Sequence, residues 1–229
     1  LVEGKDLFVD GDIVYMKTVK GPLKVDCIYR RLDDNFLDPK TFYKGSLIGV
    51  PGLFKSWRKG NVGILNAIGT GVADDKVVYS YVNKMIIYYL GEQPILNQVE
   101  TYLCHEKKQR EYVIDNISKL VVKPANASGG YGIMIGPKAD KSEREQVIAK
   151  IKKNPREYIA QPLETLSTAP TITKNEIEPR HLDLRPFVLS GKSTYVTTGG
   201  LTRVALRKGS TIVNSSQGGG SKDTLVVDA

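Results

Sequence analysis

The sequence predicts an α+β fold that is rich in strands, has few helices and pairs most of its strands antiparallel. The first observation is a series of apolar, β-branched segments near the C-terminus, at 181–191, 193–206 and 210–216, joined by short polar connections. The second is that clear helical spacing of apolar residues is limited to a few segments, chiefly 74–92 and 141–155.

The composition is that of an ordinary globular protein. Of the 229 residues, 41% are hydrophobic and 25% are charged, which is enough material for one large domain or two small ones. No apolar run approaches the roughly 18 to 20 residues that cross a bilayer, so we expect no membrane partner. The chain starts without Met and without the features of a signal peptide, and we expect it to be part of a longer polypeptide.

The cysteines and histidines exclude a standard zinc site. Cys27 and Cys104 are the only cysteines and are widely separated, and His105 and His181 are the only histidines. We expect both thiols to be structural or inert, and we expect a reducing, cytoplasmic location.

The net charge of +8 has two possible explanations. One is a nucleic-acid surface, and the other is a pocket for an anionic small molecule among ordinary surface lysines. The 33 Lys and Arg residues are dispersed, and the densest runs, at 106–110 and 141–153, alternate with Glu as on a solvated helix face. We therefore expect no nucleic-acid partner.

In the front part of the chain, the pattern predicts strands within 24–34 and at 62–65, with a short helix between them. A helix is predicted over 74–92, with Asp74 or Asp75 as its N-cap. Its apolar stripe, which we interpret as core, consists of Val78, Tyr81, Val82, Met85, Ile86 and Tyr89.

The rear part begins with a predicted strand at 119–124, a glycine-rich loop and a second short strand that ends near Gly136. An amphipathic helix is predicted over 141–155, where a proline closes it, and a strand follows at 157–163. The three C-terminal strands complete the chain.

The first candidate site is Lys123 with the loop of small residues that follows it. That loop carries Ser128, Gly129, Gly130 and Gly132. Glycines allow backbone N–H groups to approach an anion closely, and a lysine on the preceding strand adds a fixed charge. The order of residues differs from that of the P-loop. On these residues alone, a phosphate-binding loop and a flexible hairpin with an exposed lysine are equally supported.

Three further candidates lie near the C-terminus. Asp183 and Arg185 are two positions apart on a predicted strand and share a face, which suits a surface ion pair or one wall of a metal or phosphate site. Arg203 lies inside an apolar strand, where a charge usually has an anionic partner. The glycines 218–220 follow Asn214 and, taken alone, suit a linker or a disordered tail, but their strand-like neighbours argue against both.

The last candidate is in the front part. Arg31 and Asp33 are again two positions apart, and Asn66 stands at a strand end before a glycine loop. Oxygen ligands such as Asp and Asn suit Mg²⁺, which takes its remaining ligands from water and phosphates. Each pair alone is weak evidence, but all of these candidates are of the phosphate–magnesium type.

The order of these motifs resembles that of the ATP-grasp ligases. It runs from Lys123 through the glycine loop, the segment YIAQP, the D-x-R strand and Arg203 to an Asn before Gly-Gly. Those enzymes carry a further metal-binding strand at the end, and its counterpart here, VDCIYRRLDD with VGILNAIGTG, lies at the front. The sequence is therefore similar to the circularly permuted ATP-grasp type 2 family, relatives of glutathionylspermidine synthase, over nearly all of its length.

The resemblance implies roles for individual residues. Lys76 and Lys123 would contact the ATP phosphates under a lid formed by the glycine loop, and Gln161 would meet the adenine edge. Arg185 would line the phosphate and metal site, and Arg203 would steady the transferring phosphoryl group. The residues that would border the acceptor pocket beside the nucleotide are Asn214, Gly218 and Gly219.

The implied magnesium ligands are Asn66, Asp183 and either Asp26 or Asp33, between which the sequence does not decide. One departure from the family pattern is Ile64, because many ATP-grasp enzymes carry Glu at the corresponding position. A metal site without that Glu is either completed from elsewhere or weakened.

The resemblance also implies an architecture and an activity. Residues 1–73 and 166–229 would form a central ATP-grasp subdomain, and 74–165 a nucleotide-binding lid subdomain. The activity would be that of an ATP-dependent carboxylate–amine ligase with ATP and Mg²⁺ as cofactors, which activates a small-molecule acid as an acyl-phosphate for attack by an amine. The alternative is a catalytically weakened, nucleotide-binding domain with a regulatory or assembly role. The acid, the amine and the oligomeric state stay open.

Overall fold

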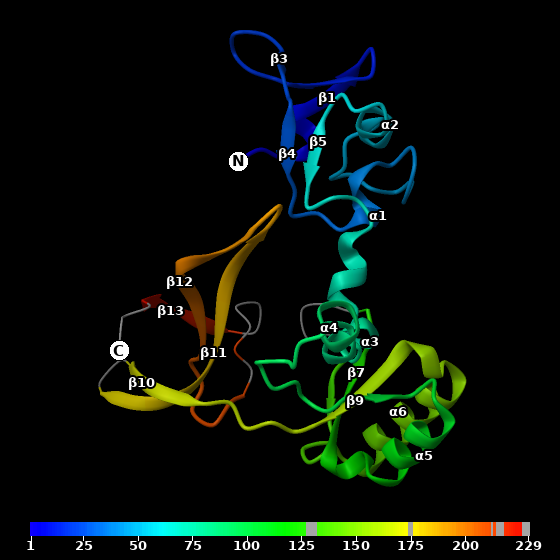
Figure 1. Cartoon of the computed structure of the whole chain (residues 1–229), viewed down its shortest axis with the longest axis vertical. Helices are drawn as coiled ribbons and strands as arrows, with labels where there is room; N and C mark the ends of the chain where they lie inside the picture. The colour runs from blue at the N-terminus through cyan, green and yellow to red at the C-terminus, as the bar shows by residue number, and fades with distance from the viewer. Residues whose placement is uncertain (127–131, 174–175, 212, 214–217, 226–229) are drawn as a thin grey trace. The chain divides into compact units, whose positions relative to one another are not determined.

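The chain forms two compact units, Leu1–Val82 and Asn83–Ala229, and each unit is described by itself. Figure 1 shows the computed structural model with its helices and strands labelled. The residues that the structure describes are 1–126, 132–173, 176–211, 213 and 218–225. The predicted division into 1–73 with 166–229 and 74–165 stays a prediction.

The first unit contains two small sheets. Its elements in chain order are η1 (Gly4–Asp6), β1 (Leu7–Asp10), β2 (Ile13–Met16), β3 (Leu23–Lys24), β4 (Cys27–Tyr29), α1 (Asp34–Leu37), α2 (Leu53–Arg58), β5 (Gly63–Leu65), η2 (Thr70–Asp74) and α3 (Lys76–Tyr79). Strands β1, β2 and β3 pair antiparallel in that order. Strands β4 and β5 pair in parallel, with Ile28 opposite Ile64. The predicted strand–helix–strand order is therefore confirmed.

The core of the first unit lies between these sheets and the two short helices. It is formed by Val14, Leu37, Val50, Leu53, Val62 and Ile64. Side chains alternate along a strand, so Ile28 and Ile64 point together toward this core while the neighbouring Cys27, Tyr29 and Leu65 are exposed.

Asp38 is a buried carboxylate that joins the end of α1 to the start of α2. Its side chain oxygens accept hydrogen bonds from the backbone N–H groups of Lys40 at 2.9 Å, Gly52 at 3.0 Å and Phe54 at 3.0 Å. Gly52 has a φ of +91°, which favours glycine at the turn that leads into α2. Because the carboxylate is completely buried, these donors replace its hydration.

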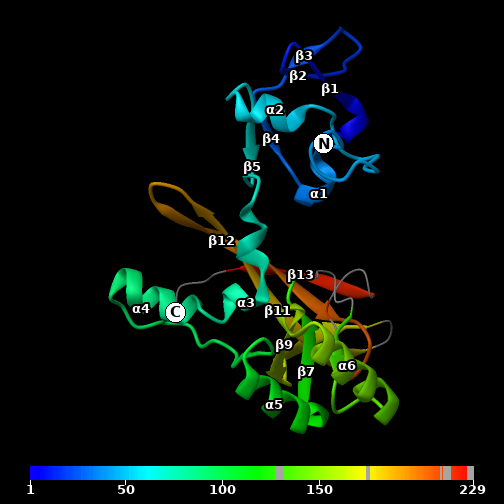
Figure 2. The same cartoon turned by 90° about the vertical axis from the view of Figure 1, so that its right-hand side faces the viewer.

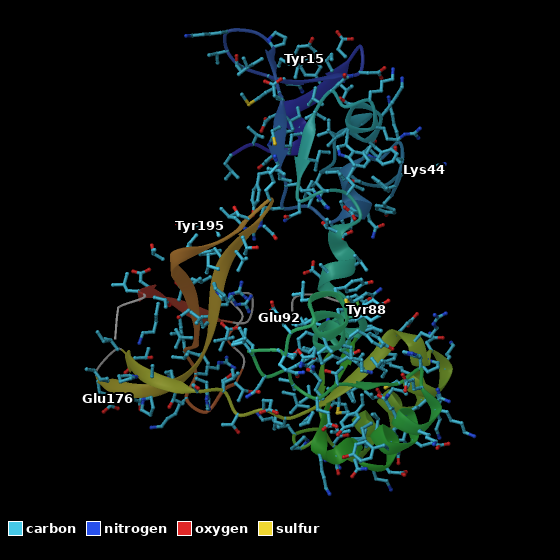
Figure 3. All side chains as sticks on the ribbon, in the orientation of Figure 1. Tyr15, Lys44, Tyr88, Glu92, Glu176 and Tyr195 are labelled. Atoms are coloured by element: carbon cyan, nitrogen blue, oxygen red, sulfur yellow. The ribbon has the colours of Figure 1, made fainter. Side chains whose placement is uncertain are left out.

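The predicted helix over 74–92 is present in two pieces, and the prediction that its stripe is core is wrong. Asp75 is the N-cap of α3 and accepts a hydrogen bond from the backbone N–H of Val77 at 2.7 Å. The second piece, α4 (Val82–Leu90), has no buried residue. Val78 lies on α3, whereas Val82, Met85, Ile86 and Tyr89 share one face of α4, and neither helix contains a buried residue. Figure 3 shows the labelled side chain of Tyr88 on α4, which is 81% exposed.

The second unit contains two antiparallel sheets. Its elements are β6 (Tyr102–Leu103), α5 (Lys107–Asp115), η3 (Ile117–Lys119), β7 (Leu120–Pro124), β8 (Met134–Ile135), α6 (Lys141–Lys153), η4 (Pro155–Glu157), β9 (Tyr158–Pro162), β10 (Thr168–Ile172), β11 (Ile177–Ser190), β12 (Thr194–Ala205) and β13 (Gly219–Leu225). The sheet orders are β6-β9-β7-β8 and β10-β11-β12-β13. The expected α+β class with mostly antiparallel sheets is confirmed.

Helices α5 and α6 cover one face of the first of these sheets, as Figure 2 shows. The core between them contains Cys104, Val113, Ile117, Leu120, Val122, Met134, Ala139, Ile151 and Ala160. Asp140 caps the start of α6, where its side chain accepts from the backbone N–H of Glu143 at 2.8 Å. Since Val122 and Ala160 face the helices, the alternate residues of β7 and β9 face the other side of the sheet.

The last predicted strand, 210–216, is wrong for the residues of it that the structure describes. Ser210, Thr211 and Val213 are not in a strand, and the backbone N–H of Ser210 donates to the carbonyl of Arg207 in a turn. The strand that pairs with β12 on the side away from β11 is β13, which begins in the glycine cluster. Pairing with a neighbour decides which residues form a strand, and β-branched composition alone does not.

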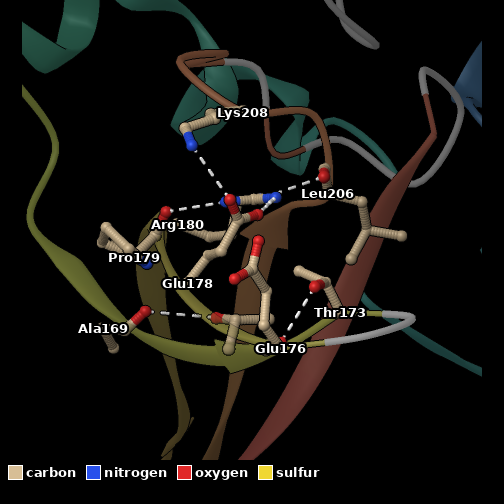
Figure 4. Close-up of polar contacts among 9 residues, drawn as sticks. Ala169, Thr173, Glu176, Glu178, Pro179, Arg180, Leu206 and Lys208 are labelled. Atoms are coloured by element: carbon tan, nitrogen blue, oxygen red, sulfur yellow. Dashed lines mark hydrogen bonds and ion pairs between the residues drawn. The ribbon is translucent and has the colours of Figure 1, made fainter.

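A buried arginine fastens β11 to the turn after β12 (Figure 4). Arg180 is 6% exposed, and its guanidinium donates to the carbonyl of Leu206 at 3.1 Å and pairs with the carboxylate of Glu178. Lys208 lies 2.9 Å from the other oxygen of that carboxylate. Hydrogen bonds from Lys208 and Arg180 lower the pKa of Glu178 below 4.5.

No helix among the described residues is long and apolar enough to span a membrane.

Replacing Asp38 by Ala should lower the free energy of unfolding by about 3 kcal/mol or more, because buried backbone donors lose their acceptor. Urea denaturation measures the loss. The matched control is Asp26→Ala, since Asp26 forms only an exposed ion pair with Lys24 and should change stability by less than about 0.5 kcal/mol. Equal effects of the two substitutions would contradict this account.

The two thiols should differ in reactivity. Cys27 is exposed, whereas Cys104 is completely buried and burial raises its pKa to about 11. Ellman's reagent at pH 8 should therefore titrate one thiol in the folded protein and the second only after denaturation. In Cys27→Ser, no thiol should react before unfolding; two fast thiols in the wild type would refute the burial of Cys104.

Glu178 should contribute to the pH dependence of stability. A carboxyl group whose pKa is lower in the folded state stabilises the protein above its unfolded pKa, near 4.5, and this stabilisation is lost as the pH falls through the folded value. The stability difference between wild type and Glu178→Gln should therefore shrink between pH 6 and pH 3. It should shrink less in a Lys208→Met background, where one cation is removed. A difference that is constant with pH would exclude this role.

Candidate functional site

Lys123 lies on the face of its sheet that α5 and α6 do not cover. The antiparallel register places Val121 opposite Gln161 and Lys123 opposite Ile159, so Lys123 and Gln161 are diagonal neighbours on one face. The ammonium group of Lys123 donates to Oε1 of Gln161 at 2.6 Å. Gln161 is 8% exposed and Lys123 is half-buried. Lys123, which was predicted to bind phosphate, is therefore hydrogen-bonded to Gln161, which was predicted to meet the adenine.

Thr101 continues this polar contact and was missed by sequence reasoning. The register of β6 with β9 pairs Tyr102 with Ala160, which brings Thr101 beside Gln161. Nε2 of Gln161 donates to Oγ1 of Thr101 at 2.8 Å. The threonine hydroxyl donates in turn to the carbonyl of Val99 at 3.0 Å. No motif includes Thr101, and only the strand pairing reveals it.

The glycine loop after β7 is described at its end only. Ser128, Gly129 and Gly130 lie outside the described residues. Gly132 has a φ of +71°, and a Cβ there would lie 3.0 Å from the ring of Pro124. At Gly132 the chain therefore passes close to Pro124, the last residue of β7, which directly follows Lys123. The roles of the loop in phosphate binding stay predictions.

The second group of predicted residues shares one face of the β11–β12 pair. Asp183 lies directly opposite Arg203, and Arg185 is two residues further along the same strand. The guanidinium of Arg185 pairs with the carboxylate of Asp183 at 2.9 Å, so the predicted common face is confirmed. Opposite Arg203 on its other side is Ser221 of β13. Two guanidinium groups and one carboxylate thus gather on one face of a sheet.

The glycines near the C-terminus lead into a strand. Gly218 has a φ of +82°, and Gly219 begins β13 opposite Ala205. Because Gly219 and Gly220 pair with β12, the structure agrees at these two residues with the expectation against a linker or a disordered tail. Asn214, the remaining predicted residue of the acceptor pocket, lies outside the described residues.

In the first unit, Asn66 follows β5 and its backbone is held by Arg30. The guanidinium of Arg30 donates to the carbonyls of Asn66 at 2.8 Å and of Ala67 at 2.9 Å, and it pairs with Asp34 at 2.6 Å. Asp34 also accepts from the backbone N–H of Gly69 at 2.9 Å. The sequence pattern singled out Arg31 and Asp33. The ion pair that holds the loop is formed instead by their neighbours, Arg30 and Asp34.

The parallel pairing of β4 with β5 separates the two alternative metal ligands. Asp33 follows the C-terminal end of β4 and Asn66 follows the C-terminal end of β5, so both lie at the same edge of the pair. Asp26 precedes β4, lies at the opposite edge and pairs with Lys24 at 3.0 Å. Asp33 accepts from the backbone N–H of Asn35 as the N-cap of α1. The strand topology therefore favours Asp33 over Asp26 as the predicted metal ligand beside Asn66.

Ile64 and Lys76 complete the predicted residues of the first unit. Ile64 is 4% exposed and packs in the core, so a carboxylate at this position would be buried among apolar side chains. Lys76 is the first residue of α3, and burial lowers its pKa against the opposing effects of Asp75 and Asp74. A partly buried ammonium of this kind favours an anionic neighbour.

The donor set fits a nucleotide with magnesium better than a metal held by protein alone. Among the described residues, no three His, Cys, Asp or Glu side chains gather closely enough to hold a metal ion. Mg²⁺ in nucleotide sites needs only one or two carboxylates, because phosphate oxygens and waters complete its octahedron. The lysine and two arginines on the sheet faces of the second unit are the cations that phosphates attract.

Comparison with known proteins identifies the family. A family model described as "Circularly permuted ATP-grasp type 2" matches residues 1–205. An uncharacterized protein of Synechocystis sp. is 57% identical over 99% of this chain, and one of Mycobacterium tuberculosis is 54% identical over the same share. A Frankia casuarinae protein named "Putative glutamate–cysteine ligase 2-2" is 48% identical, also over 99% of the chain.

The chain spans 47%, 41% and 26% of the lengths of these three relatives, respectively. The family match and the antiparallel α+β architecture agree with each other. The chain belongs to the circularly permuted ATP-grasp type 2 family and has its fold.

Proposed function

We propose that this protein is an ATP-dependent ligase that joins a carboxylate to an amine. The observation that carries the proposal is the presence, in a chain of the ATP-grasp family, of a half-buried lysine on an otherwise apolar strand at the base of a glycine-rich loop. The second support is the face of β11 and β12 on which Asp183, Arg185 and Arg203 gather. Substrates and mechanism are part of the proposal.

Lys123 and the glycine loop bind phosphate in this proposal. ATP, when bound with Mg²⁺, supplies the phosphoryl group that activates the carboxylate for attack by the amine. The ammonium of Lys123 donates to a neutral amide and is a group that forms charge-assisted hydrogen bonds to phosphate oxygens. The loop that follows excludes water, because an activated carboxylate hydrolyses readily.

Arg203 and Arg185 stabilise negative charge that develops during phosphoryl transfer. Both side chains start from the paired strands β11 and β12, whose register directs them to one face of the sheet. Asp183 contributes a carboxylate for Mg²⁺ and orients Arg185 through their ion pair. The implied roles of Lys76, Asn66 and Asp33, which belong to the first unit, stay predictions.

The names of relatives support a ligase in general. Two Frankia proteins that are 48% and 45% identical to this chain carry the name of a glutamate–cysteine ligase. Amino acids have both groups that an amide-forming ligase joins. The matched segment is only 26% of each of those proteins, so we keep the acid and the amine of this chain unspecified.

A second candidate function is nucleotide binding without ligation, in a regulatory or assembly role. Ile64 favours it, because the core position that it occupies leaves no carboxylate two residues before Asn66. The two candidates share a nucleotide site and differ in whether bound ATP is consumed.

MgATP should raise the melting temperature of the wild-type protein. Ligand at about one hundred times its Kd contributes about 2.7 kcal/mol, which corresponds to roughly 5 °C for a chain of this size. Lys123→Ala should abolish the shift, measured by differential scanning fluorimetry. The matched control is Lys119→Ala, which removes an exposed lysine just before the same strand and should keep the shift. If MgATP shifts neither the wild type nor the control, both nucleotide functions are excluded.

Consumption of ATP separates the two candidate functions. Release of ADP that requires an added amine or acid supports the ligase, and the substrates are found by screening amino acids and polyamines. Arg203→Met should then lower kcat by about 100-fold or more, since a charge that stabilises the transition state is removed. MgATP binding without any such release would favour the second candidate.

A further inference from the structure

A short chain of hydrogen bonds in the second unit ends at Lys123. It starts at the carbonyl of Val99, passes through the hydroxyl of Thr101 and the amide of Gln161, and reaches the ammonium group. Its three distances are 3.0, 2.8 and 2.6 Å. The four residues come from the segment before β6 and from strands β9 and β7, which are adjacent in the sheet.

The chemistry of these groups sets the direction of every bond. A threonine hydroxyl has one proton, and Thr101 donates it to the carbonyl of Val99. The hydroxyl oxygen therefore accepts at the other end, and it accepts from the amide nitrogen of Gln161. With its nitrogen directed to Thr101, the amide directs its oxygen to Lys123, which as an ammonium group can only donate.

Loss of the threonine hydroxyl would remove this constraint. The buried Nε2 group of Gln161 would then lack its acceptor, and the amide could shift toward another acceptor and carry Oε1 away from the ammonium. Gln161 is 8% exposed, so water replaces the lost partner poorly. The position of Lys123 would become less well defined, although no group that contacts it directly had changed.

We propose that Thr101 is a positioning residue, which acts through the amide of Gln161 to hold the ammonium of Lys123 where it binds phosphate. The effect on nucleotide rests on the proposed function; the effect on Lys123 itself does not. Gln161 then has a role beyond the predicted contact with adenine, because its amide oxygen accepts a hydrogen bond from the ammonium of Lys123.

The chain offers matched variants at one site. Thr101→Val keeps the shape and the β-branch of threonine and removes the hydroxyl, whereas Thr101→Ser keeps the hydroxyl. Circular dichroism and the melting temperature without ligand establish that each variant folds. If Thr101→Val does not fold, Gln161→Met removes the next bond of the same chain and is tested in its place.

The first readout needs no nucleotide. Acetylation by a water-soluble N-hydroxysuccinimide ester, followed by peptide mass spectrometry, measures the reactivity of Lys123 against all other lysines of the same sample. A lysine held by a neutral acceptor reacts slowly, so we expect the rate at Lys123 to rise at least about threefold in Thr101→Val and to stay within about twofold of wild type in Thr101→Ser. An unchanged rate in Thr101→Val overturns the proposal.

The second readout is the Kd for MgATP, measured by calorimetry as a double-mutant cycle. Thr101→Val should weaken binding about tenfold, as expected for one charge-assisted hydrogen bond, and Thr101→Ser should not. In a Lys123→Met background, Thr101→Val should cause no further loss, because the threonine acts only through the lysine. An equal loss in both backgrounds overturns the proposal. If wild type does not bind MgATP while the reactivity of Lys123 responds as expected, the proposed function fails and the positioning role stands.

Discussion

The antiparallel register of the two sheets in the second unit decides which charged side chains can act together. On β7 and β9 it places Lys123 and Gln161 on the face away from the helices. On β11 and β12 it places Asp183 opposite Arg203 and on the same face as Arg185. A slip of one residue in either pair would turn these groups to the opposite face, where Val122, Ala160 and Val204 are buried. The proposed phosphate contacts of Lys123, Arg185 and Arg203 depend on this register.

The same register also has an energetic consequence, because it places charged side chains within the sheets. An ammonium or guanidinium group on a half-buried strand is costly unless a polar partner compensates for lost hydration. Lys123 meets the amide of Gln161, Arg185 meets Asp183, and Arg180 meets Glu178 with two carbonyls. The Arg180 contacts serve the fold, since they fasten β11 to the turn after β12. The first two hold cations on a sheet face, where an anionic ligand can approach.

Much of this arrangement could be predicted from the sequence, because it follows from short-range rules. The alternation along a strand predicted the common face of Asp183 and Arg185, and the capping rule predicted Asp74 or Asp75 at a helix start, of which the structure has Asp75. The motif order predicted the family, which the comparison confirmed. What failed depends on pairing partners: 210–216 is β-branched, yet the strand beside β12 is β13, which starts with glycines. The stripe of 74–92 keeps its helical period on α4, yet no residue of α4 is buried, because spacing alone does not decide what packs against a helix face.

Thr101 and Arg30 were missed by sequence reasoning for a different reason. Neither lies in a motif, and each becomes important only through atoms that are distant in the sequence: Gln161 for the threonine, and the carbonyls of Asn66 and Ala67 for the arginine. No local pattern marks such residues. Likewise, the sequence does not distinguish Asp33 from Asp26 as a metal ligand. The parallel pairing of β4 with β5 does, because the two residues lie at opposite ends of these strands.

A crystal structure with a non-hydrolysable ATP analogue and Mg²⁺ tests the account most directly. The account predicts that oxygens of the analogue's phosphates lie within hydrogen-bonding distance of the ammonium of Lys123 and of a guanidinium group of Arg185 or Arg203, with the metal ion bound to Asp183. A triphosphate bound elsewhere, with these side chains in contact only with one another, would contradict it.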